Sequence, residues 1–455
     1  MCIPACSASA PSGGHAGAGA ASGSGAASGN ASHGTGGTGV GNGNTAGTSS
    51  GTAGMGGASG SMQMSGGAGA SSAEGCLGAA LLSALSRDHV MVGASMSDTT
   101  AKAAPFDARY LYLAGGLFDG KSACTSCASG CTGGGKSCAN SVGCSWWGCW
   151  QYDQDPPGAY IRDFVTKAVG DKQVPMITYY EVLQASGANE GSDEVKATAD
   201  AAFMGRYLAD FAFLLDQVGM QPALVHIEPD FWGYAEQLNA DPHATHAAVA
   251  SASSECSGFE DSIAGLGRCM VAMAHKHAPN ARVGLHASGW GTNQDVLQNR
   301  DAKLDVAAEA RKLADFLVAC GASDSDFVAT DPSDRDAAYY AMQGQNRGWD
   351  ATNATLPNFH QALAWATALA ERAGKPIVWW QIPVGNPMLD NTPQHYQDNR
   401  VDYFLSHMNE VAAAHGAALM FGAGDGQQTT PETDGGHLVQ LVKTYEAGGG
   451  QALCR

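Results

Sequence analysis

Charged residues are absent from the first 73 positions of this 455-residue chain. That stretch consists almost wholly of Gly, Ala, Ser, Thr and Asn. Such a composition buries too little apolar surface to offset the conformational entropy that folding removes. We therefore expect residues 1–75 to form a disordered tether with a root-mean-square span on the order of 45–50 Å. The folded domain is expected over residues 76–455.

Three further absences narrow the range of functions. No apolar run approaches the ~20 residues that a membrane-spanning helix needs. No basic cluster interrupts an acidic balance of −19, with 24 basic and 43 acidic residues, so a nucleic acid or an anionic membrane is not an expected partner. No G-x-G-x-x-G or G-x-x-x-x-G-K-[ST] fingerprint directly follows the early strands, so nothing supports a nucleotide fold. We expect a monomer without a cofactor.

Cysteine, in contrast, is plentiful, with 13 residues in the chain. Clustered cysteines are typical of oxidising compartments, so we expect a secreted or cell-envelope protein. The opening "MCIPACSAS" contains "IPAC", which resembles the end of a bacterial lipoprotein signal, although no apolar h-region precedes it. This resemblance implies a lipid anchor on Cys6, as in an outer-membrane lipoprotein. The alternative is that Cys2 and Cys6 are incidental in a low-complexity leader.

Six cysteines and three tryptophans fall within one insertion, residues 119–153. The insertion is too small for a hydrophobic core of its own, so we expect three disulfides to hold it together. Zinc is the alternative, because Cys124 and Cys127 are spaced C-x2-C. Its tryptophans, Trp146, Trp147 and Trp150, either form a wall of a binding cleft or fill the interior of the insertion.

After Cys76, short runs rich in Val, Ile and aromatic residues alternate with longer segments of helical period. Eight runs are expected to be strands: His89–Ser95, Arg109–Gly116, Val174–Glu181, Ala223–Asp230, Ala281–Ser288, Asp326–Asp331, Pro376–Pro383 and Ala417–Asp425. Helices are expected over 203–218, 263–277, 306–320, 359–372 and 401–415, with C-caps at Gly219, Gly321, Gly374 and Gly416. This pattern predicts an α/β fold, a (β/α)8 TIM-type barrel that is irregular at its short first crossover. A doubly wound open sheet is the alternative.

The remaining cysteines predict two further cross-links. Cys256 and Cys269 flank one connecting loop and are expected to pair. Cys76 and Cys454 bracket the folded region, and a closed barrel brings its ends together. Cys320 lies on the apolar side of a helix and is expected to be a buried thiol.

Active sites of such barrels lie at the carboxyl ends of the strands, where the βα loops converge. In "VHIEPDFWGY", His226, Glu228 and Asp230 alternate with apolar residues, so one parity should face the barrel axis while the other packs beneath the helices. Further candidate carboxylates at strand ends are Asp331 and Asp425. The other candidate substrate-binding residues are Glu181, Trp232, His286, Trp290, Trp379, Gln381 and Asn386.

Aromatic rings beside carboxylates and amides are typical of carbohydrate sites. Glycoside hydrolysis needs one protonated and one ionised carboxyl group. Glu228 or Asp230 is placed to be the acid, with Asp331 or Asp425 as its partner across the barrel. Desolvation by neighbouring tryptophans would raise the pKa of that acid, as a general acid requires near neutrality.

"IEPD" resembles the segment that bears the general acid in family 6 cellulases and cellobiohydrolases. "HASGWGTNQD" and "FVATD" are similar to segments of the two following strands in that family. The resemblance implies an inverting enzyme on a distorted barrel, with Asp230 as proton donor and with His286 and Trp290 lining sugar subsites. The family's aspartate-rich motif after the second strand is replaced by "LAGGLFDGKSACTSC", in which Asp119 is a candidate base.

Two other functions remain open. Gln381 stands where many retaining barrel enzymes place a glutamate nucleophile, which favours inversion or a non-catalytic carbohydrate-binding barrel. Alternatively, His226, His286, Asp331 and Asp425 would serve a metal-dependent hydrolase or deacetylase, although no H-x-H or H-E-x-x-H spacing supports it. The leading hypothesis is an exported glycoside hydrolase that acts on a polysaccharide or oligosaccharide.

Overall fold

The computed structural model of the protein describes residues 76–114, 117, 150–152, 156–422 and 428–453, and the backbone of 131–133 and 136–138. The predicted tether and most of the cysteine-rich insertion, including Asp119, Trp146 and Trp147, lie outside the described residues. The same holds for Asp425.

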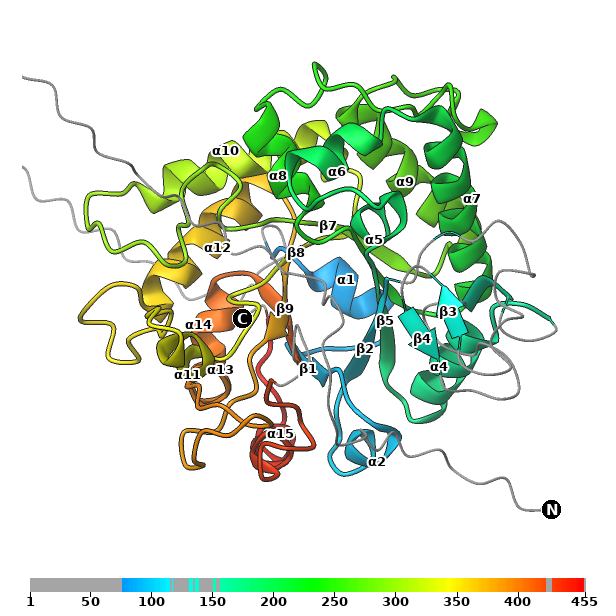
Figure 1. Ribbon diagram of the computed structural model, residues 1–455. Coiled ribbons are helices and arrows are strands. Elements are labelled where there is room, and N and C mark those ends of the chain that lie inside the picture. Colours follow the sequence, from blue (N-terminus) through cyan, green and yellow to red (C-terminus); the bar gives the residue numbers. More distant parts are fainter. Residues whose placement is uncertain are drawn as a thin grey trace, which may run out of the picture. The chain divides into compact units, whose positions relative to one another are not determined.

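Eight parallel strands close into a barrel in the order β1-β10-β9-β8-β7-β6-β5-β2 (Figure 1). They are β1 (Met91–Ala94), β2 (Ala108–Leu113), β5 (Val174–Tyr179), β6 (Leu224–Ile227), β7 (Arg282–His286), β8 (Phe327–Thr330), β9 (Ile377–Ile382) and β10 (Gly416–Phe421). All eight predicted strands are present, and closure of the sheet confirms the barrel rather than the open sheet. A separate antiparallel pair, β3 (Cys131–Gly133) and β4 (Lys136–Cys138), belongs to the insertion.

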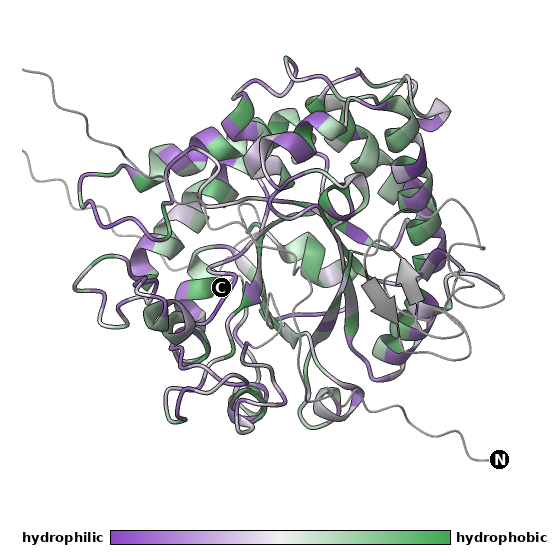
Figure 2. Ribbon diagram, viewed as in Figure 1, coloured by the Kyte–Doolittle hydropathy of each residue, from purple (hydrophilic) through white to green (hydrophobic). Residues whose placement is uncertain are grey.

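Helices surround the barrel, and they pack their apolar faces against it (Figure 2). The longer ones are α4 (Ala159–Gly170), α7 (Ala201–Val218), α8 (Phe231–Leu238), α9 (Ile263–His277), α10 (Val306–Ala319), α12 (Phe359–Ala373) and α15 (His437–Ala447). The shorter ones are α1 (Ala79–Ala84), α2 (Asp98–Ala101), η2 (Trp150–Tyr152), α5 (Val182–Ser186), α6 (Ser192–Ala197), η3 (Ser254–Cys256), α11 (Ala337–Met342), α13 (Arg400–Ser406) and α14 (Met408–Ala413). The first crossover holds only α2, as predicted. Within the described residues, no helix is both long and apolar enough to cross a membrane.

The helix predicted over 401–415 is broken at His407, and this prediction is corrected. His407 has φ −124° and ψ 37°, outside the helical region, so its backbone separates α13 from α14. Gly416 then begins β10 and does not cap a helix, because His415 occupies the positive-φ position before it (φ 59°). Gly219 and Gly374 are C-caps as predicted, and Gly321 directly follows the C-cap Cys320.

Alternation along the strands separates two buried layers. Inward-facing residues, among them Tyr110, Met176 and Phe327, form a cluster that also contains Leu81 and Leu82 of α1. Helix α1 therefore closes the amino-terminal end of the barrel, near its axis in Figure 1. Outward-facing residues pack beneath the helices in a second and larger cluster.

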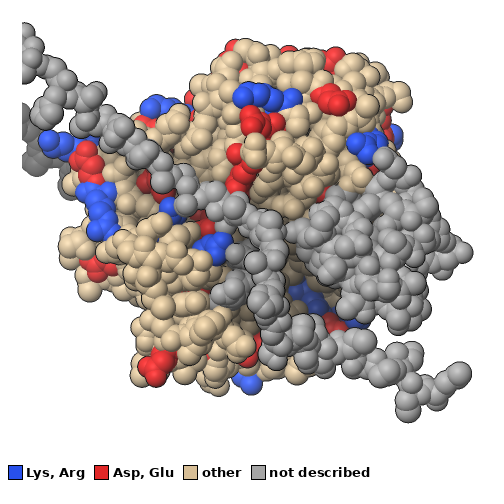
Figure 3. Space-filling view, in the orientation of Figure 1, with Lys and Arg blue, Asp and Glu red and all other residues tan. Residues whose placement is uncertain are grey.

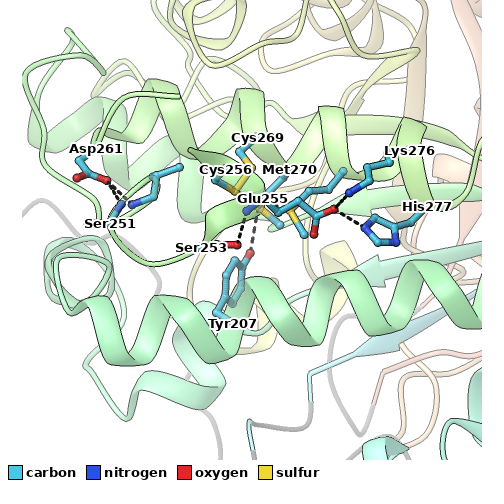
Figure 4. The surroundings of a disulfide bond; sticks show 12 residues. Tyr207, Ser251, Ser253, Glu255, Cys256, Asp261, Cys269, Met270, Lys276 and His277 are labelled. Atoms are coloured by element: carbon cyan, nitrogen blue, oxygen red, sulfur yellow. Dashed lines mark hydrogen bonds and ion pairs between the residues drawn. A yellow bond between two sulfur atoms is a disulfide. The ribbon is translucent and has the colours of Figure 1, made fainter. Parts of the chain in front are cut away.

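The predicted disulfide between Cys256 and Cys269 is present and joins η3 to α9 (Figure 4). Glu255, in the same turn, accepts a hydrogen bond from His277 at 2.7 Å, so an ion pair fixes the same loop. Cys320 is the buried free thiol that the sequence predicts. Cys76 is disulfide-bonded, but its predicted partner Cys454 lies outside the described residues.

On the face shown in Figure 3, basic and acidic side chains are interspersed over the described surface. No basic field dominates the described part of that face.

At the amino-terminal end of the barrel, a network of charged side chains joins β1 and β2 to α15. The Asp107 carboxylate lies 3.3 Å from His89 Nε2 and 3.0 Å from Arg87 Nε, and it accepts a 3.0 Å hydrogen bond from the Val92 backbone. Glu446 of α15 is 3.5 Å from His89 Nε2. The hydrogen bond with Asp107 is the main cause that raises the pKa of His89 to about 9.

This network predicts stability that declines in alkaline solution. The folded-state pKa of His89, about 9, exceeds its ordinary value of 6.5. The contribution of the imidazolium is therefore fully present below pH 6.5 and is lost as the pH rises through about 9. We expect the thermal midpoint of the wild type to fall over this interval more steeply than that of His89→Gln. Calorimetric scans with equal slopes for both proteins would contradict the prediction.

Candidate active site

The layer of side chains inside the barrel at the carboxyl ends of the strands is polar and aromatic, unlike the layers nearer the amino ends. Five strands contribute to it, through Tyr112, Thr178, His226, His286 and Trp380. The Trp380 ring lies 5.1 Å from Tyr112, 4.8 Å from His226 and 5.7 Å from His286, measured between ring centroids. Trp380 is thus the ring around which this layer packs. His226 faces inward while Val225 and Ile227 join the outer cluster, as the sequence predicts.

A chain of hydrogen bonds runs through this layer to Asp331. Thr178 Oγ1 is 3.2 Å from His226 Nδ1, His226 Nε2 is 3.1 Å from His286 Nδ1, and His286 Nε2 is 3.2 Å from Asp331 Oδ1. Burial, followed by the neighbouring His286, holds the pKa of His226 well below its usual value, so its ring is neutral. A carboxylate can only accept, so the donors run from Thr178 through both rings to Asp331.

This chain of hydrogen bonds argues against a metal site at His226 and His286. Both ring nitrogens of His226 and of His286 already take part in hydrogen bonds, so a shared metal would have to displace those partners. Among the described residues, the three side chains whose spacing suits a metal ion are His89, Asp107 and Glu446. They lie at the opposite end of the barrel, next to the guanidinium of Arg87.

The polypeptide backbone leaves β6 through a strained turn. The Phe231 backbone N–H donates to the Pro229 carbonyl at 2.9 Å, which makes Asp230 the central residue of a γ-turn with φ 68° and ψ −41°. Glu228 also has a positive φ, 48°, as does Gln381 at the end of β9, 53°. Non-glycine residues rarely adopt such angles, and those that do concentrate at functional sites.

Glu228 anchors this turn. Its Oε1 accepts hydrogen bonds from the backbone N–H groups of Glu181 and Val182, at 3.0 and 3.2 Å, and from the Tyr207 hydroxyl at 2.8 Å. Burial raises the pKa of Glu228 to about 7, although these donors act in the opposite direction. The side chain is buried, and its other oxygen, Oε2, has no hydrogen-bond partner among the described residues. Asp230 is the more exposed of the two acids.

Asp230 is half-buried, and no described residue hydrogen-bonds its carboxyl group. Burial is the main cause that raises its pKa well above the ordinary value, and the charges of Asp331, Glu190 and Asp334 add to the effect. Asp230 therefore keeps its proton more readily than an exposed aspartate does. The neighbouring Asp331 carboxylate accepts a hydrogen bond from His286. Two carboxyl groups in different environments are the arrangement that general acid–base catalysis uses.

Acidic and aromatic residues that the sequence did not single out also surround Asp230. The Glu194 side chain on α6 is fully buried, and neither of its oxygens has a hydrogen-bond partner among the described residues. Burial and then the Asp230 charge raise its pKa to about 9. Tyr234 donates to Glu190 at 3.0 Å, and its ring contacts that of the partly exposed Trp290 in a tilted arrangement, with 4.5 Å between the centroids. Glu194 was missed because "SDEV" reads as the solvent-exposed start of a helix.

Two predicted ligand-binding tryptophans pack outside the barrel interior. Trp379 contacts Phe404 of α13 at 5.5 Å, because the alternation that turns Trp380 inward turns Trp379 outward. Trp232 lies in the same outer cluster, and its indole N–H donates to the Ile227 carbonyl at 3.0 Å. The prediction that Trp379 and Trp232 bind substrate is therefore corrected, because both pack beneath the helices. Trp380 is the tryptophan that lies inside the barrel.

Other predicted residues hold the structure near the site. Trp150 is buried against Phe213 of α7 at 5.2 Å, so it fills an interior instead of lining a cleft. Asn386 is buried and donates to the Asp434 carbonyl at 3.0 Å, which joins the loops that follow β9 and β10. Gln381 accepts a hydrogen bond from the Tyr112 hydroxyl and so does lie in the polar layer.

The anchoring role of Glu228 predicts a graded loss of stability. Glu228→Ala would leave two buried N–H groups and the Tyr207 hydroxyl without an acceptor, and we expect the free energy of unfolding to fall by about 3 kcal/mol or more. Glu228→Gln keeps one acceptor oxygen and should cost about 1–2 kcal/mol. Tyr207→Phe removes a single donor and is the matched control, at about 1 kcal/mol. Urea unfolding measures all three, and an alanine variant as stable as the control would disprove the role.

No family model and no curated protein sequence matches this chain. Among solved structures, it is similar to a modular endo-β-1,4-mannanase of glycoside hydrolase family 26 from Cellulomonas fimi, at 14% identity over 81% of this chain and 73% of that chain, with a TM-score of 0.42. A family 5 mannosidase from Rhizomucor miehei shares 11% identity over 77% and 85%, with a TM-score of 0.41. The endoglucanase Cel6 from Mycobacterium tuberculosis shares 14% over 51% and 60%, with a TM-score of 0.27. These likenesses to barrel glycoside hydrolases are remote, and they do not favour family 6 over the others.

Proposed function

We propose that the protein hydrolyses glycosidic bonds, with Asp230 as the general acid and Asp331 as the general base. The observation that carries this proposal is the state of Asp230. Its carboxyl group stands in a strained turn at the carboxyl end of β6, without a hydrogen-bond partner among the described residues and with a raised pKa. A group of this kind is suited to donate a proton to a ligand that arrives from outside.

In the proposed reaction, Asp230 gives its proton to the glycosidic oxygen as the bond from that oxygen to the anomeric carbon breaks. A water molecule attacks the anomeric carbon from the opposite face and loses a proton to Asp331. His286 donates to Oδ1 of Asp331, which orients the carboxylate and leaves its other oxygen to accept that proton. One proton then returns from Asp331 to Asp230 through solvent, which completes the cycle.

Three features support the finer parts of the proposal. Inversion of configuration is favoured because Gln381, the penultimate residue of β9, is an amide where a retaining enzyme would require a nucleophilic carboxylate. A sugar ring is a suitable substrate because Trp290 and Tyr234 present aromatic surface beside Asp230. Export is supported by the Cys256–Cys269 disulfide, since such bonds persist in oxidising compartments. We extend the proposal to a lipid anchor at Cys6.

The proposal predicts release of reducing sugar from at least one member of a panel of polysaccharides. Asp230→Asn and Asp331→Asn should each lower kcat by about 10²–10⁴-fold. Asparagine tolerates positive φ better than most residues, so Asp230→Asn is expected to fold, which circular dichroism would verify. Asp216→Asn, an exposed change on α7, is the control and should be fully active. Proton NMR of the first product would give its anomeric configuration.

The raised pKa of Asp230 also predicts how kcat changes with pH. The protonated acid persists to higher pH than an ordinary aspartic acid, so kcat should be retained near neutrality and fall on the alkaline side. Binding of a glycan without any turnover would indicate a non-catalytic carbohydrate-binding barrel instead.

A further inference from the structure

A groove of about 530 Å3 lies outside the barrel, between α8, the loop that follows β7, and α10. Helices α8 and α10 contact each other at the upper edge of Figure 1. Residues that line it include Glu236, Asp241, His243, Thr292, Asn293 and Lys312. Its volume falls in the range of small-molecule sites.

Most charged side chains at this groove already have partners. Lys312 pairs with Glu309 at 2.7 Å, His243 with Glu260 at 2.6 Å, and Asp315 with Arg372 at 2.5 Å. The Asp241 carboxylate accepts a 3.0 Å hydrogen bond from the His243 backbone. These groups therefore satisfy one another without a ligand.

Glu236 is the exception. Its side chain lines the groove, the residue is only 7% exposed, and its Oε2 has no hydrogen-bond partner among the described residues. A Cβ atom built on Gly291 would lie 3.0 Å from this oxygen, so the loop backbone comes close to it without donating. Burial, and then the charge of Glu309, raise the pKa of Glu236 to about 7, while the charge of Lys312 acts in the opposite direction. A buried carboxylate without a donor is costly unless something else supplies one.

We propose that this groove binds a small organic cation with N–H donors, a primary ammonium or a guanidinium group, through the carboxylate of Glu236. Such a cation supplies the hydrogen bond that Glu236 lacks, and it adds a positive charge to that of Lys312 nearby. A divalent metal fits less well, because no group of three metal-ligating side chains among the described residues includes Glu236.

The site adjoins the candidate active site through two shared elements. Helix α8 begins directly after Asp230 and carries both Tyr234 and Glu236. Trp290, whose ring contacts that of Tyr234, precedes Gly291 of the groove, and its carbonyl accepts a 3.1 Å hydrogen bond from Gln237. A cation in the groove therefore contacts the loop that positions Trp290. The binding site itself does not depend on the proposed hydrolytic activity.

Calorimetric titration of the full chain tests the proposal. Methylammonium and methylguanidinium chlorides are the probes, and tetramethylammonium chloride, which has the same charge but no N–H group, is the control ligand. We expect saturable binding of at least one probe and none of the control. Glu236→Gln, which keeps the shape of the side chain, should weaken binding by about tenfold or more. Glu371→Gln removes an exposed acid of α12 outside the groove and should leave the affinity unchanged.

The pH dependence supplies a second readout. The cation binds the ionised form of Glu236, so the affinity should increase as the pH rises through about 7 and then level off, with proton release at lower pH. The proposal is overturned if no probe saturates, if tetramethylammonium binds equally well, or if Glu236→Gln binds as the wild type does. Stoichiometric binding of calcium that excludes the probes would overturn it in favour of a metal site.

Discussion

The hydrogen bonds to one buried carboxylate, that of Glu228, determine the shape of the candidate site. Three donors from two elements meet at its Oε1: the backbone that follows β5 and the hydroxyl of Tyr207 on α7. The end of β6 is thereby tied to its neighbour strand and to the helical layer. Asp230, two residues later, owes its strained γ-turn to this attachment, because a free loop would relax to ordinary backbone angles.

The two ends of the barrel differ in their physical chemistry. At the amino-terminal end, the leucines of α1 join the interior cluster, and the charged groups of His89 and Asp107 satisfy each other. At the carboxyl-terminal end, by contrast, several polar groups have incomplete partners, including Asp230 and Glu194. Barrels of this kind place their ligand sites at the second end.

Much of this arrangement follows from the sequence, because period-two alternation gives both the strands and the inward parity of His226. Local exceptions were not predictable. The adjacent Trp379 and Trp380 are chemically alike, and only the register of β9 decides which one enters the barrel. Glu228 and Asp230 share a parity, and the positive φ angles that separate their roles leave no mark in the residue pattern. Glu194 becomes notable only through the burial that the tertiary fold imposes.

Helix α1 closes the barrel at its amino-terminal end, so the barrel is open at its carboxyl-terminal end alone. Tyr110, Phe327 and Trp380 fill its depth, so a molecule that reaches Asp230 has no passage through the bottom. A ligand must therefore enter and leave at the carboxyl-terminal end of the barrel. A chain-like molecule that lies across that end cannot thread through the barrel.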